Sequence, residues 1–329
     1  MITRMYNAIQ VNNPSRLLVV ILNYRRSKLT IDCWRSLLDE VRSLPDTRVI
    51  VSENASGDGS VEQIKAAIET EGGSDWVSIM PLDRNGGYAF GNNAPIRAAL
   101  QSPDPPPYIL LLNPDTIVRP GALKPLVEFI NSHPDVGIAG SRLEDPDGTP
   151  PCSAFRCHTV LSKLDSGLRV GAVSKLWAKL LVWSPVPEAA TQTDWVAGAS
   201  TIVRREVFEQ VGLLDEEYFM YYEKTDFCLQ AKKAGWSCWY VPPSRVVHLV
   251  GQSSAVTDTK RPPKRLPQYW FDSRRRYFLK NYGWLNAALA DAVWALGPAI
   301  WRLRLCVQGK PDNDPPNLLS DFIRNNASC

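Results

Sequence analysis

The segment Tyr108–Val118, YILLLNPDTIV, decides how the rest of this sequence can fold. Its four apolar residues, Ile109 to Leu112, predict a short strand buried on both faces, as in a parallel sheet. Asn113 and Asp115 follow at once, and the proline between them stops the strand. Ligands of open α/β sheets collect beyond the carboxyl ends of strands, and a carboxylate there suits a divalent cation and its diphosphate. A strand that merely ends in an Asx turn would have the same residues. The other motifs must therefore distinguish a ligand site from a simple turn.

The composition is that of an ordinary globular protein. The 329 residues are 44% hydrophobic and 22% charged, with a net charge of +3, so one large or two modest domains fit and nothing requires nucleic acid. Seven scattered cysteines without a C-x-x-C pair argue against a disulfide framework and a structural zinc site. Residues 1–16 contain no apolar run typical of a secretory signal, so we expect a loose leader and a cytoplasmic protein.

The first half of the chain alternates apolar runs with amphipathic stretches. The apolar runs predict strands at residues 17–22, 48–52 and 76–80, and helical spacing predicts helices at 31–41, 61–69 and 94–100. This order implies parallel strands joined by right-handed crossovers, an α/β layout suited to nucleotides. Asn23 follows the first strand and Glu53 the second, where a carboxylate can accept hydrogen bonds from a ribose or a base.

The loop after the third strand reads DRNGGYAFGNN, residues 83–93. Its glycines permit a close backbone approach to a ligand, and its amides and arginine can donate to phosphate. It matches neither the P-loop nor the dinucleotide fingerprint. The candidate donor ligands here are Arg84, Asn85, Gly86, Gly87 and Asn92.

The second half continues with predicted helices at residues 121–132, 205–211 and 225–234 and strands at 136–139, 199–203 and 238–241. Between them, residues 142–190 are poor in β signals and carry an amphipathic run, Leu168 to Trp183. This run is either an inserted helix packed on the core or an element that shapes an acceptor site or touches a membrane.

Five blocks occur in the order and at the spacing seen in family 2 glycosyltransferases, and they resemble the rhamnosyltransferase-like branch in particular. They are LLVVILNYRR, VIVSENASGDGS, NGGYAFGNN, LLNPDTIV and DWVAGASTIVRREVFEQVGLLDEEYFMYYEKTDFCLQAKKAGW, from about Leu17 to Ser254. The resemblance implies a GT-A fold, a nucleotide-diphosphate sugar donor, a Mg²⁺ or Mn²⁺ ion, and transfer with inversion at the anomeric carbon.

The resemblance also implies roles for single residues. Glu53 falls where the family usually has an aspartate that holds the base and ribose of the donor. Asn113 and Asp115 fall on the DxD-like pair, which leaves Asp115 as the main metal ligand. His248 falls where the family places a histidine that completes the metal shell or meets the diphosphate, although a structural histidine would look the same.

Two further residues belong to the acceptor side of this pattern. The turn with Gly198 lies close to the donor sugar in the family, and Trp195 would offer the acceptor an apolar platform. A tryptophan of the core is the competing interpretation.

Inverting transfer needs one carboxylate to take the proton from the acceptor hydroxyl. Glu223 and Asp226 lie three residues apart at the start of a predicted helix, so both could face one site. The family typically has Glu-Asp-x-Asp here, with the first aspartate as the base, and this chain has Lys224 at that position. We therefore expect Glu223 to be the base and Asp226 its stand-in or partner. Alternatively, both carboxylates merely favour the helix N-terminus.

The C-terminal part has a different character. Residues 254–266 form a basic loop that could close over the donor, and residues 268–282 mix basic with aromatic side chains typical of a packed helix. Residues 284–301 are apolar, interrupted by Gly297-Pro298, and predict either a packed C-terminal helix or an interfacial helix on an anionic membrane. Residues 310–329 predict a polar, poorly ordered end.

These observations predict a leader (1–16), a GT-A domain (17–254, divided near residue 140 into nucleotide-binding and acceptor halves) and a helical extension (255–329). The expected function is metal-dependent transfer of rhamnose or another deoxyhexose from a dTDP- or UDP-linked donor to a glycan or lipid-linked acceptor, in polysaccharide synthesis for the cell envelope. The protein would work in the cytoplasm or at the inner face of the membrane. A non-catalytic binding subunit is one alternative. A sugar nucleotidyltransferase is another, but LNYRRSK lacks its glycine-rich loop.

Overall fold

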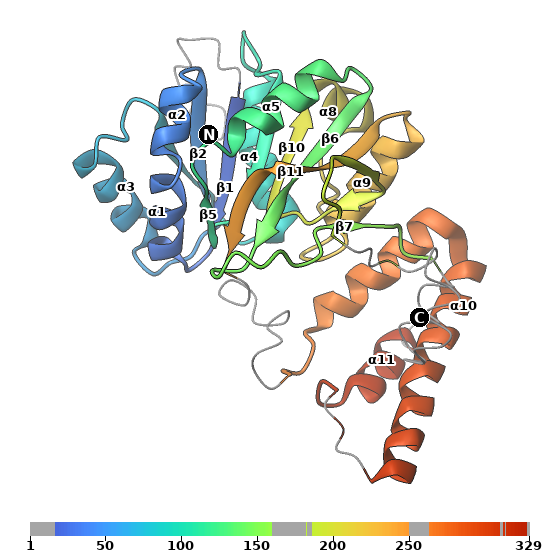
Figure 1. Ribbon diagram of the computed structural model, residues 1–329. Helices are drawn as coiled ribbons and strands as arrows, with labels where there is room; N and C mark the ends of the chain where they lie inside the picture. The colour runs from blue at the N-terminus through green and yellow to red at the C-terminus, as the bar shows by residue number, and fades with distance from the viewer. Residues whose placement is uncertain are drawn as a thin grey trace.

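The predicted strand at the centre of the sequence argument is the centre of the sheet. The computed structural model describes residues 17–159, 182, 186–249, 263–309, 312 and 314–327. In it, β4 (Tyr108–Leu112) is buried along its whole length in a nine-stranded sheet of order β3-β2-β1-β4-β10-β6-β11-β5, with β8 paired to β11 (Figure 1). The prediction of a strand covered on both faces is confirmed.

The N-terminal side of the sheet is parallel, as predicted. β1 (Leu17–Asn23) pairs in parallel with both β4 and β2 (Thr47–Glu53), and β2 pairs in parallel with β3 (Val77–Pro81). The carboxyl ends of these strands therefore share one edge. The connecting helices are α1 (Ser27–Arg35), α2 (Leu38–Ser43), α3 (Ser60–Thr70) and α4 (Gly87–Leu100). The single helix expected over residues 31–41 is thus two helices.

The C-terminal side of the sheet is mixed. β10 (Ser200–Arg204) runs antiparallel between β4 and β6 (Val136–Glu144), and β6 pairs in parallel with β11 (Ser237–His248). Through β10, the backbone N–H of Asn113 donates to the carbonyl of Ala199 at 2.9 Å, which joins the two halves of the chain. The remaining elements are β5 (Thr116–Val118), β7 (Ala154–Phe155), β8 (Thr191–Thr193), β9 (Trp195–Val196), α5 (Leu123–Ser132), α8 (Arg205–Val211) and α9 (Glu223–Lys233).

Side-chain alternation along the strands builds two cores. Val19 and Ile21 pack on one face of the sheet with Trp34 of α1, while Leu18 and Val20 pack on the other face with residues of α4 and α9. Helices cover both faces, which explains the continuous apolar strands.

The C-terminal extension is a pair of helices beside the sheet domain (Figure 1). α10 (Gln268–Gln308) bends at Gly283, whose φ of 77° and ψ of 171° are not helical. The expected polar, poorly ordered end is wrong for α11 (Leu318–Ala327), because Leu318 and Phe322 lie one turn apart and pack with Phe271. Among the described helices, none has the length and apolar character needed to cross a membrane.

Three expectations lie outside the described residues. They concern the leader (1–16), the amphipathic run at 168–183 apart from residue 182, and most of the basic loop at 254–266.

Candidate active site

A cavity of about 730 Å³ lies at the edge where the parallel strands end. Its walls come from the strand ends, the start of α4, the turn before β10, the segment leading into α9, and the start of α10. Representative lining residues are Asn54, Asn113, Gly87, Gly198, Glu223 and Trp270. Residues from five distant parts of the sequence therefore meet in one place.

Asp115 and His248 lie next to each other, and neither is among the residues that line this cavity. The antiparallel pairing of β5 with β11 places His248 opposite Thr116, and His248 Nε2 is 3.5 Å from Asp115 Oδ1. Asp115 is only 1% exposed. A buried carboxylate beside an imidazole nitrogen can supply two ligands to a divalent cation.

Asn113 Oδ1 is buried in the cavity wall with no hydrogen-bond partner among the described residues, so this oxygen is available to a bound group. Within the described part of the chain, no three His, Cys, Asp or Glu side chains gather as a metal site. An ion at Asp115 and His248 would therefore need further oxygens from phosphate or water.

Asn23 and Glu53 are hydrogen-bonded to each other and do not line the cavity. Asn23 Nδ2 donates to Glu53 Oε1 at 3.3 Å, and the same oxygen accepts from the Ser56 backbone N–H at 3.0 Å and from the Ser56 hydroxyl. The neighbour Asn54 lines the cavity instead. Asn54 was not among the predicted site residues, although this residue directly follows the end of β2.

The glycine-rich loop differs from its prediction. α4 begins at Gly87, not at residue 94, and Gly87 has a φ of +87°. A Cβ at Gly87 would lie 2.1 Å from the Phe219 carbonyl, which also accepts a 2.7 Å hydrogen bond from the Tyr88 N–H. Gly87 therefore permits a close approach of the Phe219 backbone, not of a ligand. The hydrogen bond to Phe219 also satisfies the Tyr88 N–H, which has no partner inside the helix at its first turn.

The other candidates in this loop divide into two groups. Asn85 lines the cavity, and its Oδ1 accepts from the Gly87 N–H at 3.1 Å. Arg84 is exposed above the Phe90 ring, Gly86 packs on the same ring, and Asn92 is buried inside α4 with Nδ2 on the Tyr88 carbonyl. Arg84, Gly86 and Asn92 do not line the cavity.

Glu223 is the carboxylate that faces the cavity. It is 1% exposed, and one of its oxygens lies 3.7 Å from Lys224 Nζ. Its Oε2 has no hydrogen-bond partner among the described residues. Burial raises the pKa of Glu223 above its ordinary value, although Lys224 acts in the opposite direction. A carboxylate of this kind can accept a proton from a bound hydroxyl.

Lys224 connects the two sides of the site. Its Nζ lies 4.0 Å from the centre of the Tyr88 ring, and a Cβ at Gly198 would come within 1.8 Å of its side chain. Burial acts to lower the pKa of Lys224, but Tyr88, Glu223 and, more weakly, Asp115 outweigh it, and the net direction is upward. The amine therefore stays charged within electrostatic reach of both carboxylates.

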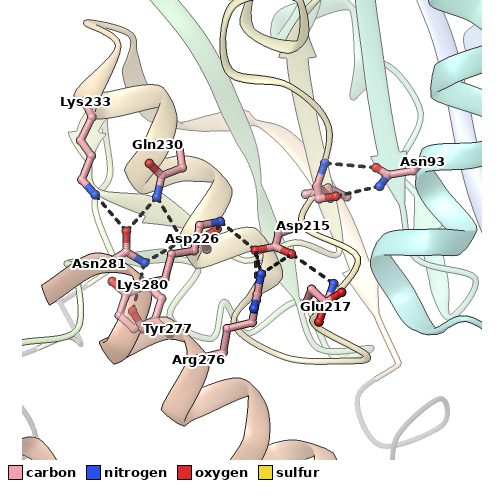
Figure 2. Close-up of polar contacts among 11 residues, drawn as sticks. Asn93, Asp215, Glu217, Asp226, Gln230, Lys233, Arg276, Tyr277, Lys280 and Asn281 are labelled. Carbon is pink, nitrogen blue, oxygen red and sulfur yellow. Dashed lines mark hydrogen bonds and ion pairs between the residues drawn. The ribbon is translucent and has the colours of Figure 1, made fainter. Parts of the chain in front are cut away.

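Asp226 does not face the cavity, contrary to the expectation that both carboxylates of this turn would. It accepts hydrogen bonds from Lys280 at 2.7 Å, Asn281 at 2.7 Å and Gln230 at 3.1 Å (Figure 2). These donors come from α9 itself and from α10, which packs on that side. Asp226 therefore anchors the C-terminal extension to α9.

The segment Asp215–Tyr222, which we call the catalytic loop, is held by the same helix (Figure 2). Asp215 pairs with Arg276 at 2.9 Å and Lys280 at 2.8 Å. Burial acts to raise the pKa of Asp215, but the bonds from Lys280 and Arg276 outweigh it and hold that pKa below its ordinary value. Ser273 Oγ also donates to the Met220 carbonyl at 2.9 Å.

Trp195 lines the cavity together with other aromatic side chains. It stacks on Phe155 with ring centres 4.2 Å apart, and its indole N–H donates to the Arg156 carbonyl at 2.9 Å. His158 and Tyr222 complete this aromatic patch. Trp195 thus combines a core contact with a face on the cavity, and its acceptor role stays a prediction.

Comparison with known proteins finds one family model that matches part of the chain. The profile described as "Glycosyl transferase family 2" matches residues 18–177. The chain is 29% identical over 207 residues to the N-acetylglucosaminyl-diphospho-decaprenol L-rhamnosyltransferase of Mycobacterium tuberculosis, covering 61% of this chain and 66% of that protein, just under two thirds. It is 26% identical to the dTDP-rhamnosyl transferase RfbF of Shigella flexneri, covering 67% of this chain and 69% of the relative.

Solved structures show the same fold. The crystal structure of GalNAc-T7 with UDP, GalNAc and Mn²⁺ superposes with a TM-score of 0.58 at 15% identity, covering 95% of this chain and 55% of that one. At this identity the likeness concerns the fold alone, and it confirms the GT-A-like sheet.

Proposed function

We propose that the chain is a glycosyl transferase of family 2 that transfers a sugar, with inversion, from a nucleotide-diphosphate donor to a glycan or lipid-linked saccharide. The family profile over residues 18–177 supports this proposal. The observation that carries this proposal is the position of Glu223: a buried carboxylate, in one cavity with the strand-end residue Asn113, has an oxygen left for a substrate.

Glu223 is the proposed base. Its Oε2 takes the proton of the acceptor hydroxyl as that oxygen attacks the anomeric carbon and the bond to the diphosphate breaks. The charged Lys224 beside it favours the ionised carboxylate before the proton arrives. Asp226, bound to Lys280 and Asn281, positions α9 instead of taking the proton.

Asp115 and His248 are the proposed ligands of Mg²⁺ or Mn²⁺. Their spacing of 3.5 Å and the free Asn113 oxygen nearby support this assignment. A divalent ion there would offset the charge that builds on the leaving diphosphate. Asn85 and Gly87 are the proposed donor contacts of the glycine-rich loop, because both line the cavity.

The names of the relatives support the proposed substrates. Rhamnosyltransferases, one of them named for dTDP-rhamnose and one for a decaprenol-linked acceptor, support a dTDP-linked deoxyhexose and a lipid-linked glycan in polysaccharide synthesis. Trp195 and Gly198 are the proposed acceptor contacts. A lipid-linked acceptor would bring the protein to the inner face of the membrane.

Donor hydrolysis and nucleotide binding test this function together. We expect release of nucleotide diphosphate from a dTDP- or UDP-linked sugar, tighter dTDP or UDP binding with Mn²⁺ in calorimetry, and loss of both effects in Asp115→Ala. Asp104→Ala, an exposed carboxylate outside the cavity lining, is the control.

Nucleotide binding without any release would favour the non-catalytic alternative. Binding that responds neither to Mn²⁺ nor to Asp115→Ala would remove the metal from the proposal while leaving Glu223 in place.

A further inference from the structure

The second part of α10, after the bend at Gly283, exposes apolar side chains along one face. Leu285 is 65% exposed, Leu303 68% and Val307 81%. The full set, which we call the α10 stripe, is Leu285, Leu289, Leu296, Ile300, Leu303 and Val307. Successive residues of the stripe lie four, seven, four, three and four positions apart, which is the spacing of one helical face.

We infer that the α10 stripe lies on the surface of an anionic lipid bilayer, with the helix parallel to the membrane plane. This inference rests on the proposed function, since a lipid-linked acceptor would be met at that surface. The inference specifies which part of the molecule contacts the lipid and which lipid charge that part prefers.

The opposite face of this helix is already occupied. Ala287 and Ala290 pack against Tyr277 and Phe278, and Trp294 packs with Phe322 of α11. Apolar contacts thus hold the helix in place and turn the stripe outward. A helix that is apolar on its free face as well needs another apolar partner.

The helix fits a membrane surface better than a membrane span. Asn286, Asp291 and Arg302 interrupt its apolar sequence, and the described helices include none suited to crossing a bilayer. Trp284, 70% exposed, directly precedes the first residue of the stripe, and exposed tryptophans are typical of membrane interfaces.

A second copy of the chain would gain too little from this surface. At 1.5 Å per residue the stripe is about 33 Å long, and at about 10 Å wide it offers roughly 330 Å² per partner. A stable protein interface buries about 800 Å² per partner. A bilayer has no such minimum area, because each apolar side chain can enter it separately.

The charges around the stripe select anionic lipid. Asp291 is the only acidic residue of the segment 284–308, and its carboxylate is taken by the buried Arg274. Arg302 and Arg304 lie at the C-terminal end of the stripe. Arg302 pairs with Asp312 at 3.0 Å, whereas Arg304 is exposed near the Trp301 ring. Cations beside an apolar face are attracted to anionic headgroups.

The same helix reaches the active site. Tyr269 and Trp270 at its start line the cavity, and Ser273, Arg276 and Lys280 hold the catalytic loop. The lipid-facing segment packs directly on this first segment through Arg274. Docking at the stripe would therefore bring the cavity within reach of an acceptor in the membrane.

Vesicle sedimentation of the full chain tests this inference. Vesicles of phosphatidylcholine, with and without added phosphatidylglycerol, carry no glycolipid, so the result does not depend on sugar transfer. We expect binding to the anionic vesicles that weakens with salt. We expect a loss of about tenfold or more in Leu289→Glu/Leu296→Glu and of about fivefold in Arg304→Ala.

Leu279→Glu is the matched control, because Leu279 is an exposed leucine of α10 before the bend and outside the stripe. Circular dichroism and donor hydrolysis in vesicle-free buffer should be unchanged in all variants. Leu289→Ser/Leu296→Ser serves if the two glutamates unfold the chain.

The inference is overturned if the wild type stays in the supernatant with anionic vesicles, or if Leu279→Glu loses as much binding as the double variant. It is also overturned if the stripe variants only convert a dimer to a monomer in ultracentrifugation. A protein that binds vesicles but releases no nucleotide diphosphate would contradict the proposed function alone.

Discussion

Two of the walls of the cavity are built in different ways. The strand-end wall, with Leu22, Asn54 and Asn113, follows directly from β1, β2 and β4 and is held by the parallel sheet. The catalytic loop has no regular structure, includes left-handed Tyr221 and Tyr222, and is held by α10 residues that lie more than fifty positions later.

We propose that this difference separates binding from catalysis. The strand-end wall depends on main-chain hydrogen bonds inside the sheet, so it should tolerate changes in α10. The catalytic loop depends on a few side-chain ion pairs, so changes at Arg276 or Lys280 of α10 should reach Glu223 without reaching the nucleotide. The following predictions test that separation.

The largest effect is expected at Glu223, where the catalytic loop enters α9. Glu223→Gln keeps the shape but removes the proton acceptor, so transfer should fall by about 10²- to 10⁴-fold. The Kd for dTDP or UDP should stay unchanged, because the strand-end wall is intact. Steady-state kinetics and calorimetry measure the two quantities.

Glu217→Gln, at an exposed position of the catalytic loop, is the control for Glu223→Gln. If Asp226→Asn abolished transfer while Glu223→Gln retained it, the base would be assigned to the wrong carboxylate.

A smaller effect is expected at Lys280, which bridges Asp215 and Asp226. Lys280→Met leaves the buried Asp226 without its cation, so the free energy of unfolding should fall by about 1–3 kcal/mol. The loss is smaller than for a fully buried ion pair because Lys280 itself is partly exposed to solvent. We also expect kcat to fall by about tenfold with nucleotide Kd unchanged. Denaturant titration and kinetics provide both measurements.

Arg42→Met removes an exposed ion pair with Asp39 and should change neither quantity. An equal loss of nucleotide binding in Lys280→Met would show that the two walls are not independent.

The smallest effect is a shift of the pH profile. As the proposed base, Glu223 would act in its ionised form, and burial raises its pKa. The acid limb of kcat/KM should therefore lie above the range of an ordinary glutamate. Lys224→Met removes the cation that lowers the pKa of Glu223, so the acid limb should move to still higher pH. At alkaline pH, kcat/KM of the variant should approach that of the wild type. Lys233→Met, an exposed lysine of the same helix, should leave the limb in place. A limb that moves to lower pH in Lys224→Met would contradict the role of Lys224.

Local patterns predicted much of the fold. The apolar runs of β1 and β4 and the helical spacing of α8 were recognisable because period and polarity are properties of neighbouring residues. Asn113 and Glu223, both predicted as site residues, line the cavity because each follows or begins a regular element whose end is set locally.

Contacts between distant segments decided the rest. The sequence alone determined which strands are buried and which polar residues end them, since one short stretch contains that information. Only the tertiary structure decided that Glu53 accepts hydrogen bonds from Asn23 and Ser56 and that Gly87 makes room for the Phe219 backbone. It also decided that Asp226 forms an ion pair with Lys280. A side chain's direction depends on which charged or apolar group packs beside it, and those groups come from segments far along the chain.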